Sequence, residues 1–233
     1  MRALLQAPPL AKLAAAGAVL GTACDALHNQ AILVYDVLPV RFELGAGSVY
    51  SSLLVPGLLA IAYAVLGGLL PELAGSVVRG GRPLLRSLSR RQRAVIAVIS
   101  TAGIIRASEM LTVAGAPAGP ATTLLLGLAI GEWALLDGSL ATLALASVVS
   151  VGGPLAELPL LYLHCWHYLA PNVFPLEAAG LFERGSTDGA WAGLDLLTGP
   201  CYFAVCTDSN ALYAWFRRGA DGDAESELLS TSL

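Results

Sequence analysis

The sequence predicts an all-α, polytopic membrane protein with six transmembrane helices and both termini in the cytosol. Of its 233 residues, 56% are hydrophobic and only 13% are charged, and the mean hydropathy is +0.69. Soluble globular proteins average about 25% charged residues. A stretch of about 20 apolar residues can cross a bilayer as a helix. Six stretches approach that length: 11–31, 49–70, 93–111, 122–136, 140–162 and 191–216.

The basic residues predict the orientation. Cytoplasmic loops collect Lys and Arg, and arginines concentrate between the second and third predicted spans. Counting spans in both directions from this connection places both termini in the cytosol. We expect one helical domain at 1–218 and an acidic, disordered tail at 219–233. The arginines of the connection are Arg79, Arg82, Arg86, Arg90, Arg91 and Arg93.

The segments between and within the spans predict further detail. The first connection, 32–48, is expected to be an interfacial loop, and small residues in spans one, two and five favour close helix packing. Pro56 is expected to kink the second span, and Asp137 with Gly138 forms a link so short that spans four and five must be antiparallel. Glycines at 152–153 with Pro154 and Pro159 predict an interrupted fifth span. The aromatic segment after it is expected to lie at the membrane interface.

Ionisable residues at membrane depth cost about 3 kcal/mol each, so each needs a reason. Asp25 and His28 lie three residues apart, on one helical face. They are typical either of a proton-relay or ligand patch or of a polar clamp between helices, and we favour the clamp. Arg106 and Glu109 are also three apart and are expected to form a structural ion pair.

Two carboxylates are expected on adjacent helices, Glu132 in the fourth span and Glu157 in the fifth. They could share a proton, bind a cation or contact the polar head of a ligand. Alternatively, each is protonated or paired with a neighbouring donor. Asp195, Asp208 and Asn210 in the last span are weaker candidates of the same kind.

The sequence predicts no enzyme, no catalytic residues, no cofactor, no metal site and no nucleic-acid partner. It contains no nucleotide-binding or hydrolase motif. His164, Cys165 and His167 are too few and too isolated for a zinc site, and interfacial anchoring by 166–168 explains this segment better. The four cysteines are scattered and are expected to be small buried hydrophobes rather than redox pairs.

Four short motifs lie within the predicted spans: Ser51-Ser52 with Val55-Pro56-Gly57 and Pro71, Ala107-Ser108, Ile130-Gly131-Glu132-Trp133 with Asp137, and Pro200-Cys201-Tyr202-Phe203-Ala204 with Asn210. They occur in the order and in the spans in which a known family carries them. From about Gly17 to Arg218 the chain therefore resembles the insulin-induced gene (Insig) family of six-span membrane proteins. The residues after Ala107-Ser108 depart from the animal pattern, which has a Lys and an Asp there.

The resemblance implies a non-enzymatic regulator in the endoplasmic reticulum membrane. Such a protein binds a sterol or a diacylglycerol-like lipid among its helices and retains a sterol-sensing membrane partner. The composition equally suits a plastid or bacterial membrane. From the helix breaks and the family motifs, the residues expected near the ligand are Pro56, Gly57, Trp133, Glu157 and Phe203.

A different function stays open beside this one. A small transporter or proton-coupled membrane protein would use Asp25 with His28 and the pair Glu132 and Glu157. The predicted interruption of the fifth span favours it, since discontinuous helices line many transport sites. A membrane-embedded enzyme of lipid metabolism is a third possibility, for which the sequence shows no catalytic residues.

Overall fold

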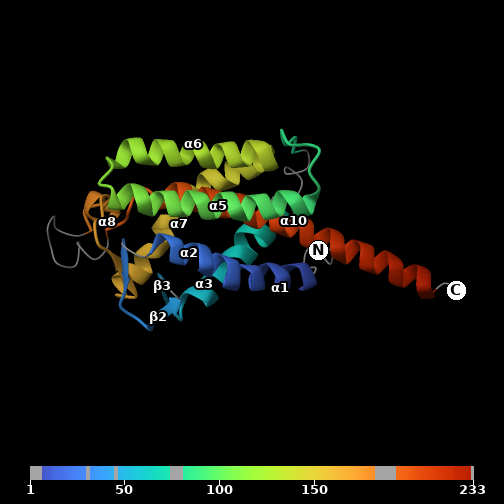
Figure 1. Cartoon of the computed structure of the whole chain (residues 1–233), viewed down its shortest axis with the longest axis horizontal. Helices are drawn as coiled ribbons and strands as arrows, with labels where there is room; N and C mark the ends of the chain where they lie inside the picture. Colours follow the sequence, from blue (N-terminus) through green and yellow to red (C-terminus); the bar gives the residue numbers. More distant parts are fainter. Residues whose placement is uncertain (1–6, 30–31, 45–46, 74–80, 182–192, 232–233) are drawn as a thin grey trace.

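The protein is mostly helical, with five helices long and apolar enough to cross a membrane (Figure 1). The computed structural model describes residues 7–29, 32–44, 47–73, 81–181 and 193–231. A further long helix, α10 (Thr198–Thr231), is not among the five, because its composition is too polar. The candidate spans are Pro8–His28, Val55–Leu73, Arg90–Val113, Ala118–Leu136 and Leu140–Tyr162.

Two of the candidate spans contain a π-helical segment, and the other three are single α-helices. The first span consists of α1 (Ala7–Ala16), the π-helical η1 (Gly17–Gly21) and α2 (Thr22–His28). The second consists of α3 (Val55–Tyr63), the π-helical η2 (Ala64–Leu69) and α4 (Leu70–Leu73). The remaining spans are α5 (Arg90–Val113), α6 (Ala118–Leu136) and α7 (Leu140–Tyr162).

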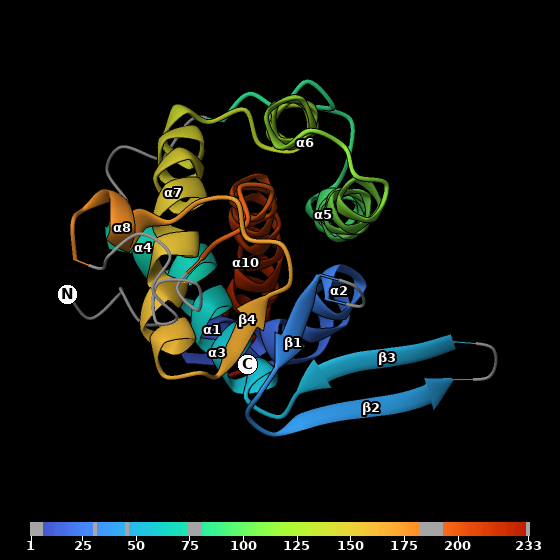
Figure 2. The ribbon, with the colours of Figure 1, turned by 90° about the vertical axis from the view of Figure 1, so that its left-hand side faces the viewer.

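Helix α10 lies in the middle of the bundle. Figure 2 looks along the helices and shows α10 surrounded by the others, and it packs on α1, η2, α5, α6 and α7. Its middle carries polar side chains, and Thr207, Asp208 and Ser209 are all buried. The long helix that is too polar to be a candidate span is thus the one that the apolar helices cover.

The chain crosses the bundle in alternating directions. The start of α1, the connection before α5 and the link between α6 and α7 lie at one end (Figure 1). The strands and the turn between α5 and α6 lie at the other. At the first end, Arg90 donates to the carbonyl of Ala214 at 3.3 Å, and Arg217 pairs with Glu72. The described part of the arginine-rich connection therefore lies beside α10, at the end where α1 begins.

Two small antiparallel sheets lie at the opposite end, and the expectation of an all-α fold missed them. Strand β1 (Leu33–Tyr35) pairs with β4 (Trp166–Tyr168), which joins the segments after the first and fifth spans. Strands β2 (Pro39–Leu44) and β3 (Gly47–Ser52) form a hairpin that projects sideways in Figure 2. The expected interfacial loop at 32–48 is therefore largely strand.

Three helix predictions were wrong in detail. The second span begins at Val55 rather than at 49, because β3 takes the preceding residues, and Pro56 lies in its first turn. A proline there loses no helical hydrogen bond, so the expected kink is absent. Helix α7 is one uninterrupted helix with Pro154 and Pro159 inside it.

The last helix also differs from its predicted bounds. It begins at Thr198 instead of 191, after Leu194 has paired with Val173. Its backbone then runs past 216 to Thr231. The disorder expected of 219–233 stays a prediction. Part of the long loop before α10, from 182 to 192, lies outside the described residues. A short helix, α8 (Pro175–Ala178), precedes that gap.

Glycines allow the central contacts of the bundle. A Cβ atom added to Gly67 in η2 would lie 2.5 Å from the carbonyl oxygen of Ser209 in α10. One added to Gly153 in α7 would overlap the ring of Tyr202. In a membrane no hydrophobic driving force pushes helices together, so they associate by close packing, which small residues allow. The predicted close packing is confirmed for spans two and five, each against α10, and for span one, where a Cβ atom on Gly17 would overlap the carbonyl oxygen of Leu59.

Gly67→Ala should destabilise the bundle, although alanine favours a helix by up to about 1 kcal/mol over glycine. The added methyl group must push η2 away from α10, at a cost of about 1–3 kcal/mol. Gly103→Ala on α5 is the matched control, because a Cβ atom there meets nothing within 4 Å. Thermal unfolding in detergent should show a lower melting temperature for Gly67→Ala only. Equal melting temperatures would refute the close contact.

Candidate functional site

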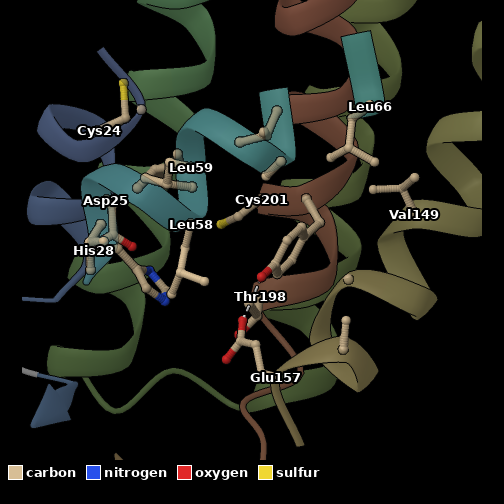
Figure 3. A pocket seen from close by; sticks show the side chains of 18 of the residues that line it. Cys24, Asp25, His28, Leu58, Leu59, Leu66, Val149, Glu157, Thr198 and Cys201 are labelled. Carbon is tan, nitrogen blue, oxygen red and sulfur yellow. Dashed lines mark hydrogen bonds between the residues drawn. The ribbon is translucent and has the colours of Figure 1, made fainter. Parts of the chain in front are cut away.

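A cavity of about 480 Å³ lies between α2, the second span, α7 and α10, with β1 and β4 at one end. Most of its walls are apolar, as Leu58, Leu59 and Val149 show in Figure 3. Ile61 of α3 and Val148 of α7 line it while being 64% and 69% exposed. The second span and α7 each pack on α10 but hardly on each other. The cavity therefore opens sideways between them, toward the surface that lipid would cover.

One polar cluster in the cavity is centred on Glu157 of α7. Its Oε2 accepts hydrogen bonds from the Tyr168 hydroxyl at 2.8 Å and from the Trp166 indole at 3.4 Å. Its Oε1 accepts from the Tyr202 hydroxyl at 2.8 Å. Burial, reinforced by the charge of Glu157, raises the pKa of Tyr168 well above its usual value, so this hydroxyl keeps its proton and remains a donor. The carboxyl group is thus held from three sides.

A second polar cluster lies on α2 and β1. Asp25 Oδ2 accepts from the Asn29 amide at 2.6 Å and from the Tyr35 hydroxyl at 2.7 Å. His28 Nδ1 lies 2.7 Å from Ser108 Oγ on α5. The bond from His28 to Ser108 joins two helices, as the predicted clamp requires. Both Asp25 and His28 also line the cavity, so the alternative of a ligand patch stays open.

Of the five residues expected near the ligand, only Glu157 lines this cavity. Pro56 and Gly57 lie on α3 beside the lining residues but not among them. Trp133 lies near the α6–α7 link, where its indole donates to the carbonyl of Ser139 at 2.9 Å. Phe203 is 1% exposed and packs in the core against α5, α6 and α7. A ligand in this cavity would not contact the last two.

Tyr202 was not among the predicted site residues, and Trp166 and Tyr168 were predicted to have a different role. The last two were expected to anchor the chain at the membrane interface, but each is only 7% exposed and faces inward. The residue between them, His167, points outward to Asp36 at 2.8 Å. Alternation of inward and outward side chains is the pattern of a strand. That two-residue period at 166–168 was the signal available in the sequence.

The other predicted polar groups have separate surroundings. Glu132 accepts a hydrogen bond from Thr101 at 3.1 Å. Within the described part of the chain, it therefore shares no hydrogen-bond partner with Glu157. Asp208 accepts a hydrogen bond from Tyr63 at 3.0 Å. Glu109 pairs with Arg106 as expected. Among the described residues, no group of three or more His, Cys, Asp or Glu side chains could hold a metal ion.

Tyr202→Phe should lower the free energy of unfolding by about 1–3 kcal/mol, because it leaves a buried oxygen of Glu157 without its donor. The same substitution should cost much less in a Glu157→Met background, where no acceptor remains to be satisfied. A double-mutant cycle of detergent-stability measurements gives the coupling. Additive effects of the two substitutions would contradict the bond.

Comparison with known proteins identified no relative: no family model, no curated protein and no solved structure matches the chain. The site therefore rests on the residues and contacts described above.

Proposed function

We propose that this chain is a six-span membrane protein that binds a lipid in the cavity and thereby regulates lipid metabolism. In the manner of the Insig family, the ligand would be a sterol or a diacylglycerol-like lipid, the protein would not be an enzyme, and it would retain a membrane partner, such as a sterol-sensing protein. The observation that carries the proposal is the apolar cavity of about 480 Å³ that opens sideways between α3 and α7.

The cavity has the size and lining expected of a lipid site. Small-molecule sites commonly measure about 300–1,000 Å³ and combine apolar walls with a few polar groups that orient the ligand. Here apolar side chains from α2, the second span, α7 and α10 form most of the walls, and the polar groups gather around Asp25, His28 and Glu157. A sideways opening lets a ligand enter from the bilayer without crossing water.

The bundle supports the proposed topology. With α10 counted as the sixth span, the start of α1, the arginine-rich connection and the exit of α10 lie at one end (Figure 1), which the arginines mark as cytosolic. Three of the four motifs that resemble the Insig family lie at the cavity: Val55, Cys201 and Tyr202 line it, and Ser108 hydrogen-bonds to the lining residue His28. The endoplasmic reticulum is the membrane that this resemblance implies, with a plastid or bacterial membrane as the alternative.

Retention of a partner would follow from a shift in population. A ligand between the second span and α7 favours whichever packing of these helices holds it better, in proportion to its difference in affinity for the two packings. Because the second span and α7 hardly contact each other, few direct contacts between them oppose a change in their separation. The surface they present to a neighbouring membrane protein would change with it.

One observation favours proton-coupled transport as a second candidate. Glu132 and Asp208 are buried, and each has one carboxyl oxygen for which the described part of the chain supplies no hydrogen-bond partner. Unpaired buried carboxyl groups in membrane helices are typical of proton relays. Proton-dependent flux into proteoliposomes that is lost in Glu132→Gln would favour this function over lipid binding.

Gly152→Phe should abolish or strongly reduce binding of the native lipid. Gly152 lines the cavity, and a Cβ atom there meets nothing within 4 Å, so the phenyl ring can fill the cavity without distorting α7. Gly127→Phe on α6 is the matched control, since it is equally unobstructed but lies outside the cavity. Mass spectrometry of the lipids that co-purify in mild detergent should find a lipid that is enriched with wild type and with Gly127→Phe but not with Gly152→Phe. Equal enrichment in all three proteins would place the lipid elsewhere.

A further inference from the structure

One nitrogen atom at the polar end of the cavity lacks a hydrogen-bond partner among the described residues. It is Nε2 of His28, a side chain that is 7% exposed. Figure 3 shows the imidazole of His28 projecting from α2 into the cavity, on the opposite side from Glu157. A buried polar atom is normally paired, because leaving it unpaired forfeits its hydration. This atom therefore points to a missing partner.

The contacts of Ser108 favour one tautomer of His28. Ser108 Oγ lies 2.6 Å from the carbonyl of Ile105, to which it can donate its single hydrogen. With that hydrogen used, the same oxygen accepts from His28 Nδ1, which lies 2.7 Å away. In a neutral imidazole with the proton on Nδ1, Nε2 holds a lone pair and accepts. In this tautomer, the ligand must supply the donor.

The remaining polar groups restrict the charge of that ligand. Asp25 and Glu157 contribute two carboxyl groups to the lining, and no lysine or arginine is among the described residues that form it. An anionic headgroup, such as a carboxylate or a phosphate, would meet two acidic groups and no base. It would also bring no proton to Nε2. An uncharged headgroup with an O–H satisfies both conditions.

We infer that His28 is the specificity-determining residue of the cavity, and that its Nε2 accepts a hydrogen bond from the hydroxyl group of an uncharged lipid alcohol. The inference rests on the proposed lipid binding and specifies the headgroup. Ser108 is a positioning residue, because it holds the imidazole in the accepting tautomer. The tyrosines around Glu157 already have their acceptor and do not compete for the ligand hydroxyl.

The test compares three probes of matched length on the full-length protein in detergent: hexadecan-1-ol, its methyl ether and hexadecanoate. Native mass spectrometry over a range of probe concentrations gives the dissociation constants. Wild type should bind the alcohol about fivefold to tenfold more tightly than the ether, the worth of one hydrogen bond. Hexadecanoate should bind most weakly. His28→Phe should bind alcohol and ether equally, and His28→Gln, which keeps an acceptor, should retain part of the preference.

Leu58→Ala is the control within the cavity, because it removes apolar lining and should weaken alcohol and ether by the same factor. Binding of both probes to wild type without a preference for the alcohol would overturn the role of His28 and leave lipid binding intact. An unchanged preference in His28→Phe would do the same. Failure of wild type to bind any of the probes would instead count against the proposed function itself.

Discussion

The constraint on which the structure depends is that α10 cannot face lipid. Its middle carries Thr207, Asp208, Ser209 and Asn210, and a single aspartate at the centre of a bilayer costs about 3 kcal/mol. The apolar helices surround it and supply its polar partners: Tyr63 donates to Asp208, and the carbonyl of Leu66 accepts from Asn210 at 3.4 Å. The polar side chains of α10 therefore place this helix at the centre of the bundle and do not keep it out of the bundle.

The cavity is a consequence of this arrangement. Helices that pack on a common central helix need not pack on each other. The second span contacts α10 at Gly67 and α7 contacts α10 at Gly153, but the second span and α7 hardly contact each other. The space between them is closed at one end by the β1–β4 sheet, which brings Trp166 and Tyr168 to Glu157. The side between the second span and α7 stays open to the surroundings of the protein. An apolar cavity with a polar end and an open side follows from the packing.

Hydrophobicity and length were sufficient to predict the five apolar helices, because the bilayer imposes both. The same signal failed at residues 49–52, since an apolar run that continues from a strand into a helix has no boundary that composition reveals. The proline-containing α7 stayed continuous because tertiary packing overrides a local helix breaker. Glu157 could be predicted as a site residue because a carboxyl group at membrane depth is energetically costly. Its partners Trp166, Tyr168 and Tyr202, however, come from segments up to 45 residues away. Only the folded chain shows which ones meet.

The most direct test of the central position of α10 is reaction of the native cysteines with a membrane-impermeant maleimide in membranes that are opened to the reagent on both sides. Cys201 and Cys206 lie on α10 and are 7% and 0% exposed, whereas Cys165 on the segment after α7 is partly exposed. If α10 is the inner span, Cys165 reacts, and the two α10 cysteines react only after denaturation. Rapid labelling of Cys206 in the native protein would show α10 in contact with water and would contradict the account.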